Sequence, residues 1–135
     1  MPTLTRWFLR AAIVNLVAAL ALAILMALPG NAAAAPLWRP VYIHLLVMGW
    51  ATQMIFGVAL WMFPRRKPLD LRTADWLGWG CFVFTNAGLL LRAVSEPALG
   101  SGRAWAGPTV AVAAGLQLAA ILAFVIQAWP RVTAR

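Results

Sequence analysis

Charged and metal-binding side chains are scarce in this chain of 135 residues. Charged residues make up 10% of it, with three carboxylates against eleven lysines and arginines, and it holds one histidine and one cysteine. A single cysteine, Cys81, excludes an intrachain disulfide and a cysteine metal cluster. The carboxylates Asp70, Asp75 and Glu96 all fall near the ends of apolar runs. We therefore expect no intramembrane carboxylate pair that couples protons or cations.

The sequence lacks the motifs of several classes of activity. A glycine loop that cradles phosphate is absent, and one histidine inside an apolar run does not serve a serine hydrolase. A repeated, proline-broken pair of apolar runs, typical of secondary transporters, is also lacking. The net charge of +8 does not indicate nucleic acid, because the basic residues flank apolar runs. Anionic lipid headgroups are the partners that this pattern favours.

Hydrophobic residues make up 64% of the chain, far above a soluble domain. An apolar run of about 20 residues is long enough to cross a bilayer as a helix. The chain is therefore predicted to be all-α, an integral membrane four-helix bundle forming a single domain. We interpret the first run as a span, because it is long for the core of a signal peptide. The four spans are expected at residues 7–28, 41–63, 74–94 and 109–129.

Prolines and polar residues indicate where these helices begin and end. Pro40 is expected in the first turn of the second helix, where proline is best tolerated. Thr73 is a plausible N-cap of the third helix, with Asp75 close to its N-terminal dipole. The other breaks are expected at Pro29–Asn31, at Pro97 with Gly100 and Gly102, and at Pro130.

Basic residues are distributed unevenly on the two sides of these spans. One side has Arg6, Arg10, Arg65, Arg66, Lys67, Arg72, Arg131 and Arg135, and the other has only Arg39, Arg92 and Arg103. The positive-inside rule then places both termini in the cytoplasm. We expect a multi-pass protein of the inner (cytoplasmic) membrane. Tryptophans at the span ends fit the aromatic belt of such proteins.

The only histidine, His44, lies in the second span. At the rise of an α-helix it falls about 6 Å below Pro40 on the outer side. Arg39, Arg92 and Arg103 are expected at the same level. A histidine inside a span often bonds one helix to another. Neutral imidazole is also an axial ligand of heme iron, and nearby cations suit the heme propionates.

Other embedded polar residues are expected to form hydrogen bonds between helices; they are Asn15, Gln53, Asn86, Gln117 and Gln127. Gly49 and Gly57 flank Gln53 and favour a close approach of a second helix. Met48 follows His44 by one turn, and we interpret it as a packing residue. Cys81 is expected to be buried and inert.

The stretch from Trp38-Arg39-Pro40 through His44, Gly57 and the exit Trp61-Met62-Phe63-Pro64-Arg65 resembles the second helix of the catalytic subunit of heme-copper oxidases and nitric oxide reductases. That helix has a histidine near its outer end, a glycine midway and an aromatic-x-x-Pro exit. Its histidine is an axial ligand of the low-spin heme. The resemblance implies this role for His44.

The resemblance covers about 30 residues, and the differences from the family limit which of its properties we expect in this chain. The family's subunit has about twelve spans and several further histidines, for the high-spin heme, the copper and the second axial position. This chain is not expected to reduce oxygen or nitric oxide by itself, nor to be an enzyme. It is similar to one four-helix arc, about a third of such a subunit. A homo-oligomer, a trimer or a dimer, would rebuild a comparable bundle.

The leading hypothesis is a membrane protein that binds heme b through His44 and acts in electron transfer or in heme or gas binding. Arg39, Arg92 and Arg103 are the predicted cofactor-binding residues, and a redox partner is implied. For Arg92 the alternative is an i,i+4 pair with Glu96. A second hypothesis is a non-catalytic accessory or assembly subunit of a respiratory complex, with His44 structural. A small passive channel is a third.

Overall fold

The computed structural model describes residues 1–63 and 71–132, and of residues 71–75 it describes the backbone only. These residues form long helices and no strand. They are α1 (Thr3–Ala27), the 3-10 turn η1 (Pro29–Asn31), α2 (Ala35–His44), the π-helix η2 (Leu45–Thr52), α3 (Gln53–Met62), α4 (Leu71–Gly100) and α5 (Ala106–Val132). Because α2, η2 and α3 follow one another without a break, the described chain has four rods.

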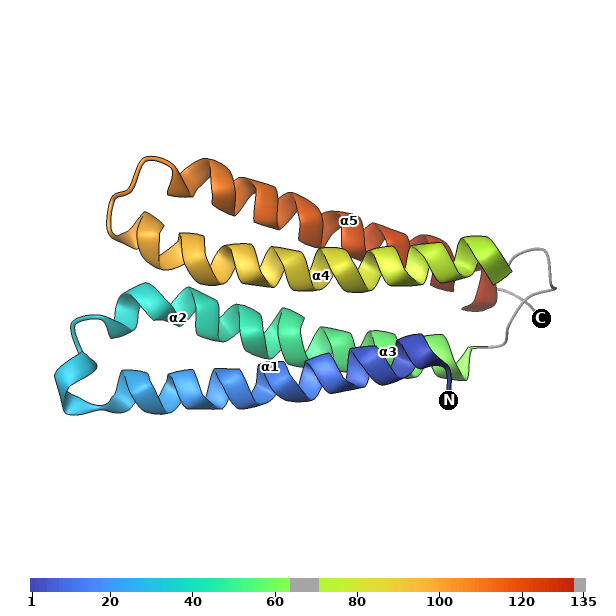
Figure 1. The fold of residues 1–135 in the computed structure, drawn as a ribbon, viewed down its shortest axis with the longest axis horizontal. Helices are drawn as coiled ribbons and strands as arrows, with labels where there is room; N and C mark the ends of the chain where they lie inside the picture. Colours follow the sequence, from blue (N-terminus) through green and yellow to red (C-terminus); the bar gives the residue numbers. More distant parts are fainter. Residues whose placement is uncertain (64–70, 133–135) are drawn as a thin grey trace.

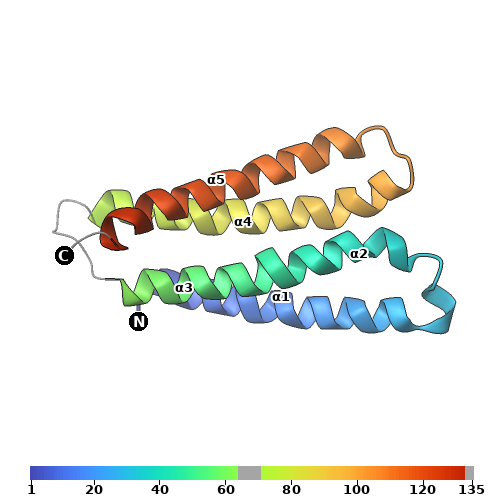
Figure 2. The same ribbon diagram turned by 180° about the vertical axis from the view of Figure 1, so that it is seen from behind.

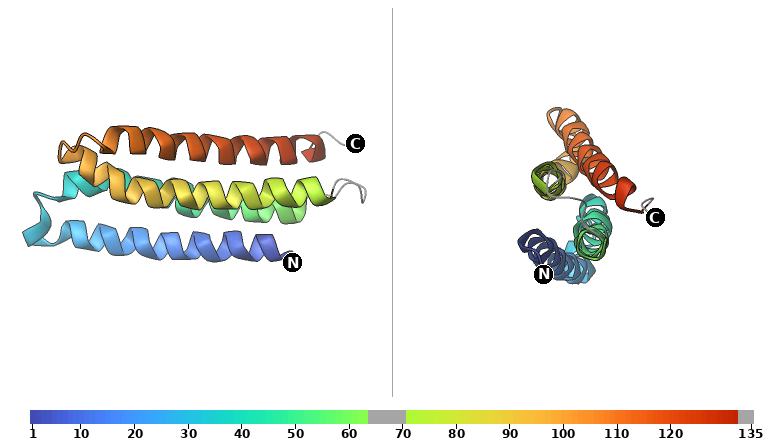
Figure 3. Two further views of the ribbon diagram at one scale, coloured as in Figure 1. Left: turned by 45° about the horizontal axis from the view of Figure 1, so that its top comes forward. Right: turned by 90° about the vertical axis from the view of Figure 1, so that its right-hand side faces the viewer.

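The four rods lie along one axis, and each runs antiparallel to the rod that precedes it in the sequence (Figures 1 and 2). The start of α1 and the end of α5 lie at one end of the bundle (Figure 1). The other end, which we call the loop end, carries η1 and residues 101–105 (Figure 1). Each rod packs against the next in the sequence, so α1 and α5 lie on the outside of the array (Figure 3).

Four helical stretches of the described chain are long and apolar enough to cross a membrane. They are Thr3–Ala27, Ala35–Met62, Trp76–Gly100 and Ala106–Val132. Large apolar side chains such as Val14, Leu90 and Ile126 are exposed on the outside of these rods. Exposing such an apolar surface to water costs free energy, whereas exposing it to lipid does not. For the described residues, the prediction of a helical fold with four helices long and apolar enough to cross a membrane is confirmed.

Aromatic side chains fill the core in the half of the bundle nearer the termini. Phe56 of α3 stacks on Phe124 of α5 with ring centroids 3.9 Å apart. Phe8 of α1 meets Phe82 of α4 edge to face at 5.2 Å. Cys81 is fully buried in the same cluster, as the sequence indicates. Aromatic pairs of this geometry stabilise a bundle by about 0.5–1.5 kcal/mol beyond their burial.

The helix ends differ from the sequence-based expectation at four prolines or caps. Pro40 lies inside α2, and Pro36 occupies the first turn instead. Thr73 is not the N-cap of α4, because that helix begins at Leu71. Pro97 lies inside α4 and Pro130 inside α5. Membrane helices tolerate internal prolines, since neighbouring helices and local adjustments satisfy the freed carbonyls. The break at η1 is confirmed.

The π-helix η2 begins directly after His44. Runs of i→i+5 hydrogen bonds are rare and occur often at functional sites. Met48 lies within η2, and its sulfur accepts a hydrogen bond from the Thr52 hydroxyl at 3.8 Å. The wider turn of η2 changes the direction of every side chain that follows His44, and nothing in the sequence indicates it.

Two glycines of the second rod lie against a neighbouring helix, as predicted, and that helix is α1. A Cβ atom added to Gly49 would lie 2.8 Å from Cβ of Asn15, and one added to Gly57 would lie 2.9 Å from Cβ of Phe8. These distances are too short for real carbon atoms. The close approach of α1 therefore depends on the absence of side chains at these positions.

Gly57→Ala is expected to destabilise the bundle by about 1–3 kcal/mol, because the new methyl group forces α1 away from the second rod. The measurement is reversible unfolding in mixed detergent micelles. Gly115→Ala in α5 is the matched control, because its Cβ would enter open space. That variant should gain about 0.5–1 kcal/mol from helix propensity. Equal stability of the two variants would contradict the close approach.

Candidate functional site

His44 is the last residue of α2, near the loop end, and its ring is partly buried, with 28% of the side chain exposed. The ring atom Nδ1 lies 2.9 Å from the carbonyl oxygen of Pro40 and 3.3 Å from Oε1 of Glu96 in α4. The carbonyl oxygen of Pro40 can only accept a hydrogen bond, so this contact assigns a proton to Nδ1. In the neutral ring the lone pair is then on Nε2, which has no partner among the described residues.

Glu96 connects His44 to a second cation. Its Oε1 lies 2.7 Å from Nη1 of Arg92, one turn earlier on α4. The Nε of Arg92 donates in turn to Oε1 of Gln117 in α5, at 2.9 Å. The side chains of Glu96 and Arg92 are only 7% and 14% exposed. We call His44, Arg92, Glu96 and Gln117 the polar cluster; it joins the second, third and fourth rods.

The polar cluster is not fully satisfied by its own members. Oε2 of Glu96 and Nε2 of Gln117 are buried and have no hydrogen-bond partner in the described part of the protein. The carboxylate oxygen is an acceptor and the amide nitrogen is a donor, so each could form a further hydrogen bond next to the Arg92 contacts. Buried polar atoms without partners are rare in stable proteins. The polar cluster therefore differs from an ordinary hydrogen bond between helices, because two of its buried atoms have no partner among the described residues.

The three predicted arginines share the loop end with His44 but not its contacts. Arg92 belongs to the polar cluster, whereas Arg39 and Arg103 are exposed and form no hydrogen bond or ion pair with its described members. The i,i+4 pair of Arg92 with Glu96, the alternative for this residue, is present. The basic residues Arg65, Arg66 and Lys67 lie outside the described residues, as do Arg135 and the Arg72 side chain.

A second polar contact lies halfway along the bundle. Gln53 of α3 and Asn86 of α4 exchange two hydrogen bonds, at 3.2 and 3.1 Å. Asn86 also donates to the carbonyl oxygen of Phe82 at 2.8 Å. Asn15 of α1 donates to Ala11 within its own helix, at 2.9 Å. The amide pair confirms that Gln53 and Asn86 bond between helices, and it sets the register of the two rods.

Metal binding by side chains alone has little support in the described residues. They contain no group of three histidine, cysteine, aspartate or glutamate residues that could hold an ion. An iron already held by a porphyrin needs only one or two axial ligands from protein. His44 fits that need: metal-ligating histidines commonly donate the other ring N–H to a backbone carbonyl or a carboxylate. Nδ1 of His44 has both.

Sequence reasoning missed the role of Glu96 and Gln117. Glu96 was expected only near an interface or paired with Arg92, and Gln117 only as a bonding side chain. The spacing of Arg92 and Glu96 on one helix signals their pair. Their contacts with His44 and Gln117 cross between rods, and no sequence pattern signals those.

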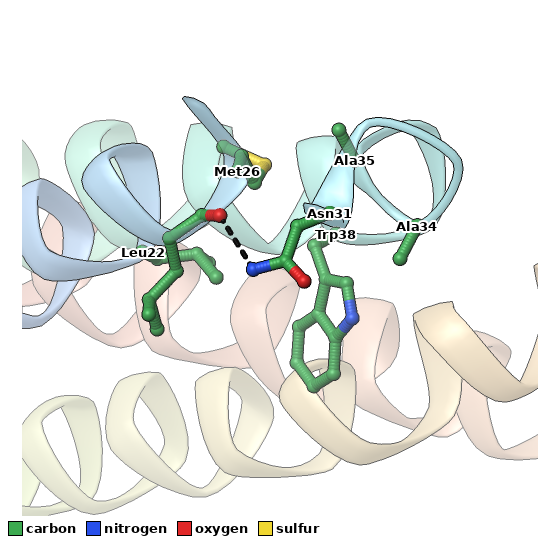
Figure 4. Close-up of a pocket in the computed structure, with 7 residues that line it drawn as sticks. Leu22, Met26, Asn31, Ala34, Ala35 and Trp38 are labelled. Atoms are coloured by element: carbon green, nitrogen blue, oxygen red, sulfur yellow. Dashed lines mark hydrogen bonds between the residues drawn. The ribbon is translucent and has the colours of Figure 1, made fainter. Parts of the chain in front are cut away.

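A cavity of about 360 Å³ lies between the end of α1, η1 and the start of α2. Figure 4 shows it with Trp38 and Asn31 at its wall, and the Asn31 amide donates to the carbonyl of Leu25 at 2.9 Å. Its remaining walls are apolar, from Leu22, Leu25, Met26, Ala34 and Ala35. No residue of the polar cluster lines it, so it is separate from the candidate site.

Comparison with protein families, with curated proteins and with solved structures gave no significant match to this chain. The resemblance of the His44 segment to heme-copper oxidases therefore stays a prediction.

Proposed function

We propose that this chain is a membrane protein that binds heme b through His44 and acts in electron transfer or in heme or gas binding. The observation that carries the proposal is the pair of oxygen atoms beside Nδ1 of His44, the carbonyl oxygen of Pro40 and Oε1 of Glu96. Pro40 and Glu96 hold the proton on Nδ1, which leaves the Nε2 lone pair free to ligate. Heme, when bound, would supply an iron that changes oxidation state.

The surroundings of His44 suit a large, flat, apolar cofactor. Ile43, Val47 and Trp50, close to it in the same rod, are exposed apolar residues. Arg39 and Arg103, exposed at the same end, offer cations for propionates. With both termini in the cytoplasm, as the charge distribution favours, the propionates would point outward. The cytoplasmic membrane is the location that we propose on the same ground.

The test is the absorption spectrum of protein purified from heme-replete cells. A Soret band that sharpens and shifts on reduction is expected, because a b-type heme changes its spectrum with iron oxidation state. Apo protein titrated with hemin should acquire the same band and saturate. A preparation that stays colourless under both treatments would overturn the proposal.

One histidine per chain gives one axial bond, so we propose that the chain works as a homo-oligomer. A two-fold dimer would place His44 of both copies on one iron. A trimer, which the resemblance favours, would hold a five-coordinate heme at each boundary between chains, open to a gas molecule. Closed symmetry of this kind is usual for homo-oligomers.

Native mass spectrometry from detergent is expected to distinguish these assemblies. A dimer sharing its heme should carry one heme per two chains, whereas a trimer should carry one heme per chain. The optical spectrum provides the control, because it reports whether the iron is six- or five-coordinate. A strict monomer that retains a six-coordinate heme would contradict both arrangements.

A second candidate is a non-catalytic accessory or assembly subunit of a respiratory complex. The contact of His44 with Glu96 favours it, because that contact connects α2 to α4 as a structural histidine would. Under this alternative the isolated chain stays colourless and co-purifies with larger subunits.

A further inference from the structure

The carboxylate of Glu96 lies close to His44 as well as to Arg92, although its ion pair with Arg92 does not require a contact with His44. An i,i+4 pair with Arg92 is complete within α4, at 2.7 Å. The same oxygen nevertheless lies 3.3 Å from Nδ1 of His44, which belongs to another rod. A buried carboxylate so close to an N–H group polarises that bond, because little water screens the interaction, and the pairing of the same oxygen with Arg92 moderates the effect.

We infer that Glu96 is a positioning residue of the heme ligand. It fixes the ring plane and tautomer of His44 together with Pro40 and sets how strongly Nε2 donates to iron. This inference rests on the proposed heme site and adds a residue to it. Second-shell carboxylates of this kind hold the orientation of a ligating histidine and raise its basicity.

The other members of the polar cluster hold the carboxylate in place. Arg92 binds the oxygen that faces His44, and Gln117 binds Arg92 from α5. Arg92 also draws charge from Glu96, so it weakens the pull of the carboxylate on the Nδ1 proton. His44, Arg92 and Glu96 are the charged or titratable groups in the contacts of this cluster. Nδ1 of His44, in the second rod, is therefore connected through Glu96 and Arg92 of the third rod to Gln117 of the fourth.

The inference predicts opposite effects of two neutralising substitutions on the heme potential. Glu96→Gln should make the potential more positive, because a more weakly polarised histidine stabilises ferric iron less. Arg92→Gln should make it more negative, because Glu96 then acts unopposed. A cation that neutralised a propionate would give the same negative shift when removed. The single variant therefore does not identify the route.

The double variant Arg92→Gln/Glu96→Gln separates the two routes, as in any double-mutant cycle. If Arg92 acts through Glu96, its substitution should have almost no effect on the potential once Glu96 is neutral. If Arg92 binds a propionate, the full negative shift should persist in that background. Persistence of the full shift would overturn the role assigned to Arg92. Arg6→Gln, which removes an exposed cation at the start of α1, away from the loop end, is the matched control and should change nothing.

A measurement without heme tests the positioning role independently. His44 is the only histidine of the chain, so protein labelled with 15N-histidine gives one pair of ring nitrogen signals. The wild type should show a proton on Nδ1 and none on Nε2. Glu96→Gln should shift the Nδ1 proton signal upfield, since the acceptor next to it loses its charge. The neutral double variant should show the same shift, which covers the case that Glu96→Gln alone fails to fold.

Failure of this inference and failure of the heme proposal give different results. A colourless wild type with the expected nitrogen signals would overturn the heme site but keep Glu96 as the residue that orients His44. If the wild type binds heme, and Glu96→Gln has the same His44 nitrogen signals and the same heme potential as the wild type, the heme site is kept and the inference is overturned.

Discussion

Replacing His44 with alanine is expected to remove heme from the purified protein and to abolish the Soret band. His44 is the only imidazole in the chain, and no cysteine thiolate lies near it, since Cys81 is buried in the core of the other half of the bundle. The iron would lose its axial ligand, while the apolar contacts of the porphyrin alone would bind weakly. Heme content per chain, from the pyridine hemochrome assay, should fall to background.

Two controls separate loss of the ligand from loss of the fold. Imidazole added to His44→Ala should restore a heme spectrum, because a free imidazole can occupy the space of the missing ring. Met48→Leu changes a packing residue one turn away and should retain heme. Full retention of heme by a folded His44→Ala protein would exclude His44 as the ligand.

Removing one partner of the buried Arg92–Glu96 pair is expected to cost about 3–5 kcal/mol of stability. In Arg92→Leu, the carboxylate of Glu96 stays buried without its cation. In Glu96→Leu, the guanidinium of Arg92 is left unpaired. The two side chains are only 14% and 7% exposed, so solvent cannot take over the lost interaction. Reversible unfolding in mixed micelles measures this cost.

The double variant Arg92→Leu/Glu96→Leu is the sharpest control for this pair. Replacing both charges by apolar side chains removes the desolvation penalty along with the attraction, so stability should return close to that of the wild type. A surface pair would behave differently, since exposed ion pairs contribute about 0–1 kcal/mol. If each single variant costs less than about 1 kcal/mol, the pair is not buried in the folded protein.

The pattern along the chain predicted the helices well because membrane helices depend on local features. Each helix satisfies its own backbone hydrogen bonds, and about 20 apolar residues suffice to place it in lipid. The four apolar runs therefore became four helices. Small residues at Gly49 and Gly57 also identified where α1 approaches closely. The end points were less predictable, because Pro40, Pro97 and Pro130 lie inside helices that the surrounding bundle stabilises.

The candidate site divides in the same way between sequence and structure. The sequence by itself determined that a lone histidine lies inside a membrane helix, and that three arginines belong to the same end. It also indicated the Arg92–Glu96 pair as one of two alternatives for Arg92, because that spacing brings the two side chains together on any α-helix.

Only the tertiary structure decided which residue of another rod contacts His44. The contact of its Nδ1 with Glu96 depends on how α2 and α4 pack, and the contact of Arg92 with Gln117 depends on how α4 and α5 pack. The π-helix after His44 further changes the direction of the side chains that follow it. Such contacts join residues 25 to 52 positions apart in the chain, by the numbering of Arg92 with Gln117 and of His44 with Glu96. Helix periodicity relates only residues within one rod, so the distances between rods are fixed by packing alone.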